Sequence, residues 1–210
     1  GDLEGAHVAM AAALSMAACH AERCHWQVAM AQLCRHLGRA GEARELLDAA
    51  TAGLQREHTE HALRGLAAAE QLRAELCLDQ RDNAGALAAV ARCEALLLGY
   101  DAQRESALSL VLRMRAGEVL SPALIEEARA YFRADGDLQN VGLMVHILGL
   151  AAKRKRDLEL ARQYYTEAMT LFRQSGARKN TILVLAHLGQ VCTWLGRLSE
   201  GRSHLERSLQ

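Results

Sequence analysis

Two Cys-His pairs near the start of the chain are the side chains best suited to hold a metal ion. Cys19-His20 and Cys24-His25 carry thiol and imidazole groups, which are common zinc ligands. The pairs flank a predicted turn between two helices, so their side chains could converge. Their spacing matches no familiar zinc motif, however, and His58 with His61 offers only two ligands. We therefore predict no metal site and no cofactor.

Catalysis has little support in the sequence. Carboxylates such as Glu70 and Glu75 lie on predicted helices among many other charges, without an apolar pocket that would activate them. No strand–turn–helix segment presents a nucleophile, and no Gly-x4-Gly-Lys-Ser/Thr stretch is present to bind a phosphate. We predict that the chain is not an enzyme.

The basic run Lys153-Arg154-Lys155-Arg156 has two interpretations. Four cations could grip phosphates or an acidic partner. Alternatively, the run is a solvated turn, favoured by the negative end of the preceding helix dipole. No aromatic residues interleave with the cations, and 25 basic residues balance 25 acidic ones across the chain. These features favour the second interpretation, so we expect no direct contact with nucleic acid or membrane.

The elements that position these side chains repeat along the whole chain. One small residue recurs about every 40 residues, about five positions after a turn-like cluster, and such periods are typical of helical repeat arrays. A residue without bulk allows two paired helices to cross closely. The small residues are Ala6, Ala43, Ala86, Ala128, Ala161 and Gly201.

The last two full units repeat most clearly. Phe132-Arg133-x-x-Gly136-x-x-x-Asn140 returns one repeat later as Phe172-Arg173-x-x-Gly176-x-x-x-Asn180. Each unit is predicted to hold a first helix that ends at the turn cluster and a second helix that carries the small residue. Eleven helices are predicted, close to 2–18, 21–37, 40–56, 59–80, 83–99, 102–119, 122–135, 138–154, 157–175, 178–195 and 198–209.

Composition agrees with an all-helical core. Half the residues are apolar but only 4% are aromatic, and the chain has a single proline, Pro122, at a predicted first turn of a helix. Cys34, Cys77 and Cys192 each precede the small residue of their unit by nine positions, and Cys93 also falls at a repeated inner position. We interpret these four as small core residues. A reducing, cytoplasmic location is therefore expected.

The residues at the repeated positions of each unit resemble those of the tetratricopeptide repeat (TPR) family. Two units carry the alternating large and small residues of that repeat: Val145, Leu148, Gly149, Ala152, Leu158, Ala161, Tyr165 and Ala168 in one, and Leu185, Leu188, Gly189, Cys192, Gly196, Leu198, Gly201, Leu205 and Ser208 in the other. The resemblance implies an all-α, right-handed superhelix with about five helix pairs plus one leading helix, and a concave groove lined by first helices. The units are expected at 1–20 (a half), 21–58, 59–100, 101–136, 137–176 and 177–210, within a single repeat domain.

The length of the repeat unit indicates which TPR arrays this chain resembles. With these long units, the array is similar to those of MalT-type, ATP-dependent LuxR-family regulators and of SARP-type activators, which are bacterial transcriptional regulators. That resemblance implies a sensor or interaction domain, and we expect a fragment of a larger protein because both ends fall inside a repeat unit and no initiator Met is present. The alternatives are a stand-alone TPR adaptor or scaffold, or a peptide-pheromone receptor.

The implied groove selects a set of candidate binding residues. Asn140 and Asn180 occupy equivalent points of adjacent units, where their amides could hold an extended peptide or could merely cap their helices. The occupant is expected to be a protein or peptide, or a small-molecule inducer, and the apolar terminal helices could form a homodimer. The candidates are His25, Gln32, Arg35, Gln71, Glu75, Arg113, Asn140, His146, Lys153, Asn180, Gln190 and Trp194.

Overall fold

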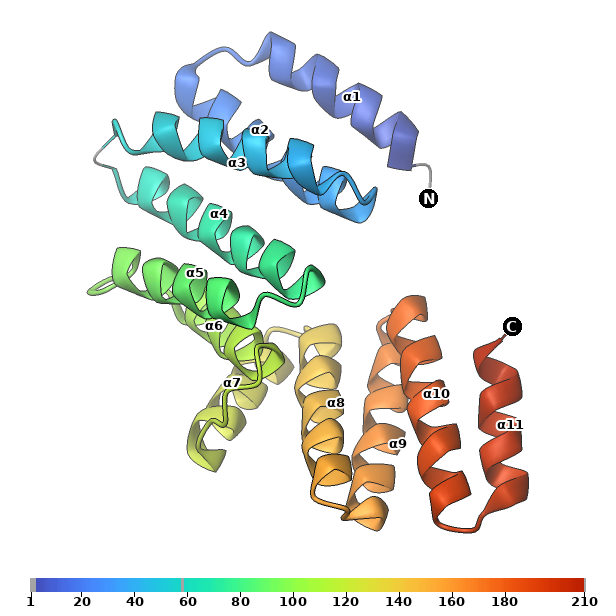
Figure 1. Cartoon of the computed structure of the whole chain (residues 1–210). Helices are drawn as coiled ribbons and strands as arrows, with labels where there is room; N and C mark the ends of the chain where they lie inside the picture. The colour runs from blue at the N-terminus through green and yellow to red at the C-terminus, as the bar shows by residue number, and fades with distance from the viewer. Residues whose placement is uncertain (1–2, 58, 210) are drawn as a thin grey trace. The chain divides into compact units, whose positions relative to one another are not determined.

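The computed structural model describes residues 3–57 and 59–209, so Gly1, Asp2, His58 and Gln210 lie outside the described residues. The described residues form eleven α-helices, which follow one another as antiparallel neighbours within each part of the chain (Figure 1). The helices are α1 (Leu3–Met16), α2 (His20–His36), α3 (Ala40–Leu54), α4 (Glu60–Asp79), α5 (Asn83–Leu96), α6 (Gln103–Arg115), α7 (Pro122–Ala134), α8 (Leu138–Arg154), α9 (Leu158–Gln174), α10 (Arg178–Trp194) and α11 (Leu198–Ser208).

The chain divides into two compact units, Gly1–Glu118 and Val119–Gln210. The division falls inside the predicted repeat 101–136, so α6 belongs to the first unit and α7 to the second. We predicted a helix over 102–119 with Gly117 inside it, but α6 ends at Arg115 and Gly117 has a φ of +92°. The predicted single repeat domain stays a prediction.

Helix ends follow the local signals in the sequence. Asp157 caps α9 by accepting a hydrogen bond from the backbone N–H of Leu160, and Pro122 occupies the first turn of α7, as predicted. Gly176 follows α9 at a φ of +71°, a left-handed conformation in which glycine is unstrained. After α4 and α8 the same conformation is adopted by Arg81 and Arg156, with φ values of 63° and 65°.

The small repeated residues lie where helices cross. Ala43, Ala86, Ala128 and Ala161 are buried, as predicted, whereas Ala6 is exposed on α1, a helix without any buried residue. Gly201 leaves no room for a side chain, because an added Cβ would lie 2.7 Å from Thr193 Oγ1 and 3.0 Å from the carbonyl oxygen of Gly189. In α3, α5, α9 and α11 the buried small residue therefore permits the close approach of the preceding helix.

Each unit has its own core. In the first, Met30, Leu47 and Leu76 join α2, α3 and α4 into one buried cluster. In the second, Phe132, Tyr165 and Phe172 are among the largest fully buried side chains. Of the four cysteines interpreted as core residues, Cys34, Cys93 and Cys192 are buried and Cys77 is half-buried. All six cysteines are free thiols.

Candidate functional site

The second unit brings three predicted site residues together at the C-terminal ends of α8 and α10. Lys153 Nζ donates a hydrogen bond to Gln190 Oε1 at 3.1 Å and lies 5.9 Å from the centroid of the Trp194 ring. Arg156 Cζ lies 5.8 Å from the same ring. The indole is thus flanked by two cations, a favourable electrostatic contact with its π face. We call Lys153, Arg156, Gln190 and Trp194 the Trp194 cluster.

Helix termination places the two cations of the cluster. The backbone N–H groups of Arg156 and Asp157 donate to the carbonyls of Lys153 and Ala152, which closes the last turn of α8 with Arg156 in the left-handed conformation. Lys153 is the penultimate residue of α8, and Trp194 is the last residue of α10. Burial, followed by the charge of Arg154, lowers the pKa of Lys153. The half-exposed indole (48%) remains accessible.

A buried aromatic group lies near this cluster, further along the same helices. His146 Nε2 and His187 Nδ1 of α10 are 2.9 Å apart, so one imidazole donates a hydrogen bond to the other. The Tyr165 ring of α9 is 5.7 Å from the His146 ring and 5.3 Å from the His187 ring. Gly149 makes room for this tyrosine, because a Cβ there would lie 2.6 Å from Tyr165 Cε1.

Burial controls the ionisation of this group. It lowers the pKa of His146 to about 4, with smaller contributions from the charges of His187 and Lys153. Burial, then the charge of Lys153, also lowers the pKa of His187. The pKa of Tyr165 rises to about 12 for the same reason, and its buried hydroxyl has no hydrogen-bond partner among the described residues. The two imidazoles are therefore neutral at physiological pH and tie α8 to α10.

The first unit places its predicted polar residues in contacts between successive first helices. Arg35 of α2 forms an ion pair with Glu75 of α4, and its Nε donates to Asp79 Oδ2 at 2.6 Å. Arg115 of α6 reaches Glu75 from the other side at 3.8 Å. Gln71 donates from Nε2 to the carbonyl oxygen of Glu105 at 3.0 Å. The charges of this surface are thus largely satisfied by one another.

The remaining predicted residues lie apart from these groups. His25 stacks on His61, with ring centroids 4.2 Å apart, and Gln32 is exposed on α2. Arg113 pairs with Glu118 and with Glu94 of α5. The Asn140 amide donates to Asp137, the N-cap of α8, at 2.8 Å.

The structure shows the surroundings of the paired asparagines and of the two Cys-His pairs considered from the sequence. Asn140 takes part in capping, the alternative noted above, while Asn180 is half-buried in the first turn of α10. In the Cys19-His20 and Cys24-His25 region, Cys19 caps α2 and Cys24 lies in a buried hydrophobic cluster. His58, considered above with His61, falls outside the described residues.

Several residues of these groups were not among the predicted ones. His187 follows His146, and Arg115 follows Glu75, at a spacing close to one repeat. The repeat spacing was the signal that could have selected both. Tyr165 was assigned only a packing role, and Arg156 only a place in a solvated turn.

Comparison with known proteins supports the fold. No protein-family model matches the chain, and no curated protein sequence does. Among solved structures, the crystal structure of BtubC (BKLC) from P. vanneervenii is similar, with a TM-score of 0.66 and 15% sequence identity over 99% of this chain and 90% of that chain. At this identity the likeness shows the fold alone. The predicted all-α, TPR-like array of helix pairs is confirmed.

None of the described helices is both long enough and apolar enough to form a transmembrane span.

Proposed function

We propose that the chain is a protein-interaction scaffold that docks an extended acidic segment of a partner protein on the Trp194 cluster. The observation that carries this proposal is an accessible indole with two cations, Lys153 and Arg156, at 5.9 Å and 5.8 Å from its ring centroid. Tryptophan and arginine dominate binding hot spots because they combine a large contact area with polar recognition. A partner carboxylate could replace Gln190 as the acceptor for Lys153.

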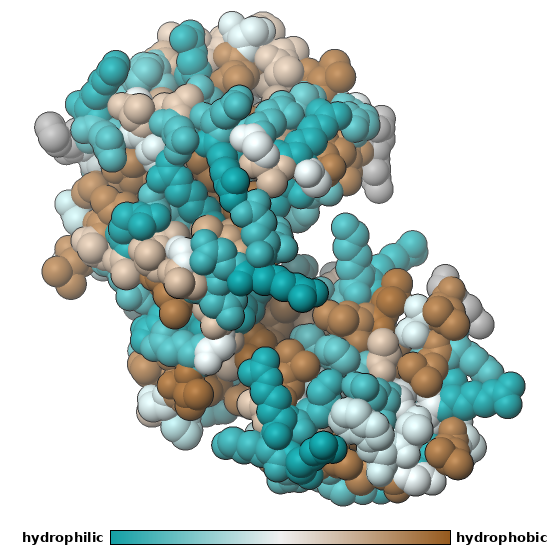
Figure 2. All heavy atoms as spheres, in the orientation of Figure 1, coloured by the Kyte–Doolittle hydropathy of each residue, from teal (hydrophilic) through white to brown (hydrophobic). Residues whose placement is uncertain are grey.

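Apolar surface beside the cluster supports a protein partner. Hydrophobic residues reach the surface over α10 and α11 (Figure 2). The exposed Leu198 begins α11, four residues after Trp194, whereas the exposed Ile182 and Leu183 lie toward the opposite end of α10. Partner side chains that alternate between apolar and acidic would contact both this surface and the two cations. The surface of the first unit is a weaker candidate, because Arg35, Glu75 and Asp79 already neutralise one another.

Of the roles left open by the sequence, the scaffold is the one that the fold likeness favours. The sensor role within a transcriptional regulator has no support in the matches. The two roles differ in their response to a partner: a sensor changes its conformation or self-association, whereas a scaffold does not. Sedimentation velocity with and without bound peptide separates them, and it also tests the predicted homodimer, which stays a prediction.

The docking proposal is tested with an array of short peptides that alternate Glu or Asp with Leu or Phe. Each is paired with a Gln or Asn counterpart. Fluorescence anisotropy should show binding of acidic peptides that weakens as salt is raised. Trp194→Ala should weaken that binding by about tenfold or more, equivalent to about 1.4 kcal/mol. The control Leu98→Ala changes a side chain in the first unit that is 83% exposed, and it should have no effect. Equal binding of acidic and amide peptides, or binding unchanged by Trp194→Ala, would overturn the proposal.

A further inference from the structure

Two similar groups of metal-ligating side chains recur at equivalent places in the array. Cys34 precedes Glu42 across the turn between α2 and α3, and Cys192 precedes Glu200 by the same spacing across the turn between α10 and α11. A histidine lies close to each Cys-Glu pair: His7 of α1 beside the first and His204 of α11 beside the second. In each trio, His7-Cys34-Glu42 and Cys192-Glu200-His204, the ligand atoms all lie within 4.8 Å of one another.

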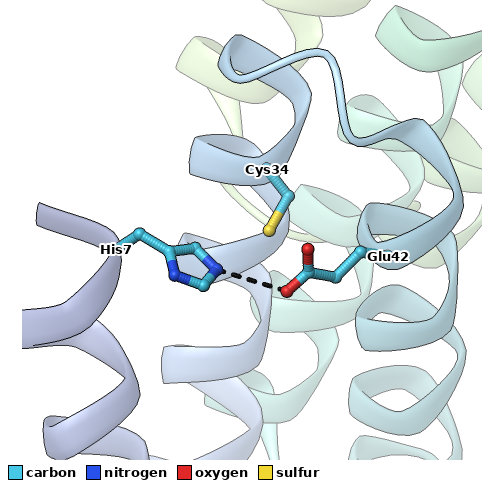
Figure 3. A group of neighbouring side chains, drawn as sticks. All are labelled: His7, Cys34 and Glu42. Carbon is cyan, nitrogen blue, oxygen red and sulfur yellow. Dashed lines mark hydrogen bonds and ion pairs between the residues drawn. The ribbon is translucent and has the colours of Figure 1, made fainter. Parts of the chain in front are cut away.

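The first trio gathers its ligands from three helices. Figure 3 shows the His7 ring of α1 directed at the Glu42 carboxylate of α3, with the Cys34 sulfur of α2 pointing toward both. His7 Nε2 and Glu42 Oε1 are 3.2 Å apart. Cys34 is fully buried, whereas the side chains of His7 and Glu42 are 20% and 42% exposed. An ion could therefore enter from solvent and reach all three groups.

The donor set and its dimensions fit zinc. Imidazole nitrogen, thiolate sulfur and carboxylate oxygen are its usual protein ligands, and a tetrahedral ion would separate the nitrogen and the sulfur by about 3.6 Å. The ligand atoms now lie within 4.8 Å of one another, so they would have to draw together around the ion. Three protein ligands leave the fourth position to water.

We propose that His7, Cys34 and Glu42 form a zinc site that fastens α1 to the α2–α3 pair. Such a cross-link would add to weak packing, because none of the 14 residues of α1 is buried and Met10 packs only partly buried against the core cluster of α2, α3 and α4. α1 also forms the exposed ion pair between Glu4 and Arg39, at 2.9 Å, and exposed pairs contribute little. A metal bond through His7 would add a strong cross-link at the second turn of the helix.

The second trio is less suited to a cation. The Cys192 thiol lies in the field of two guanidinium groups, those of Arg162 and Arg197. Glu200 and His204 also come from one helix, so an ion there would join α10 and α11, which already pack closely. Near Cys34 the corresponding cation is Arg39, which is paired with Glu4, just as Arg162 and Arg197 are paired with Glu159. The difference between the trios is therefore mainly in the helices that supply the ligands. The first trio is therefore the proposed site, and the second provides a comparison.

Cobalt(II) titration of the chelator-treated full chain tests the site. We expect one equivalent to bind with a thiolate-to-cobalt charge-transfer band and the visible spectrum of tetrahedral cobalt, both removed by added zinc. Cys34→Ser should abolish the charge-transfer band, and His7→Ala should weaken binding at least tenfold. Cys192→Ser should leave both unchanged. A spectrum without the sulfur band, or a band lost in Cys192→Ser and retained in Cys34→Ser, would overturn the proposal.

Hydrogen exchange provides a second readout that does not depend on the spectrum. Zinc should slow amide exchange in residues 3–16 of the unmodified chain and should have no such effect in His7→Ala, whose fold is checked by circular dichroism. Unchanged exchange in α1 at saturating zinc would show that an ion bound there does not fasten the helix. Neither experiment involves the Trp194 cluster, so failure here and failure of the docking proposal are distinguishable.

Discussion

The buried imidazole of His146 makes the stability of the second unit depend on pH. Its pKa is about 4 in the folded chain and about 6.5 when unfolded. Because the folded pKa is lower, the unfolded state binds more protons between these values, and acid favours unfolding. Stability is fully present above pH 6.5 and is lost as the pH falls toward 4. The loss is about 2 kcal/mol between pH 7.5 and pH 5, and about 3 kcal/mol below pH 4.

Urea unfolding followed by tryptophan fluorescence measures this loss. The chain has two tryptophans, Trp26 in the first unit and Trp194 in the second, so a Trp26→Phe background reports on the second unit. The window from pH 7.5 to 5 lies above the range in which ordinary carboxylates titrate. In that background, the free energy of unfolding should fall by about 2 kcal/mol through His146, and by a further, smaller amount through His187.

The variant His146→Gln isolates the cause. It retains a group that can hydrogen-bond to His187 but cannot titrate, so the fall in stability should shrink to less than half. A remainder is expected because the pKa of His187 is also lowered. His204→Gln, in the same unit, should keep the full fall. If the curves of His146→Gln and its parent stay parallel from pH 7.5 to 5, the buried imidazole is not the source and the reasoning is refuted.

Three further substitutions test packing and charge, each by urea unfolding. Tyr165→Phe should raise stability by about 1 kcal/mol, since it removes a buried hydroxyl without a partner among the described residues; a loss would reveal a hidden hydrogen bond. Gly149→Ala should cost about 1–2 kcal/mol, because its Cβ meets the Tyr165 ring, whereas Gly41→Ala has open space and should gain up to about 1 kcal/mol. A double-mutant cycle on Arg35→Ala and Asp79→Ala should give a coupling of about 0.5–1 kcal/mol that falls in high salt; no coupling at low salt would contradict the paired geometry.

The helices and their ends could be predicted because their causes are local. Asp157 and Gly176 act on their own helix turns, and the small residue of each repeat is visible as a period in the sequence. These signals placed all eleven helices within a few residues of their observed bounds. They also indicated that Lys153, Gln190 and Trp194 lie at the ends of neighbouring first helices, where the structure has them.

The side-chain partners could not be predicted in the same way. Whether Arg113 or Arg115 reaches Glu75 depends on the rotation of α6 about its axis, which sequence period does not fix. The contact of Tyr165 with two imidazoles requires the packing of three helices. His7 and Cys34 lie far apart in the sequence and belong to no local motif. Such groups depend on tertiary packing, and only repeat spacing hints at them.

The ion pairs that join the first helices of the first unit restrict how this array can evolve. Arg35, Glu75 and Arg115 follow one another at intervals of one repeat and alternate in sign. Deleting the repeat that carries Glu75 would set Arg35 against Arg115, and duplicating any one of the three would set two like charges side by side. Loss or gain of two repeats together preserves the alternation. Recombination should therefore change the length of this segment by pairs of repeats, and a charge reversal in one repeat should persist only with a matching reversal in its neighbours.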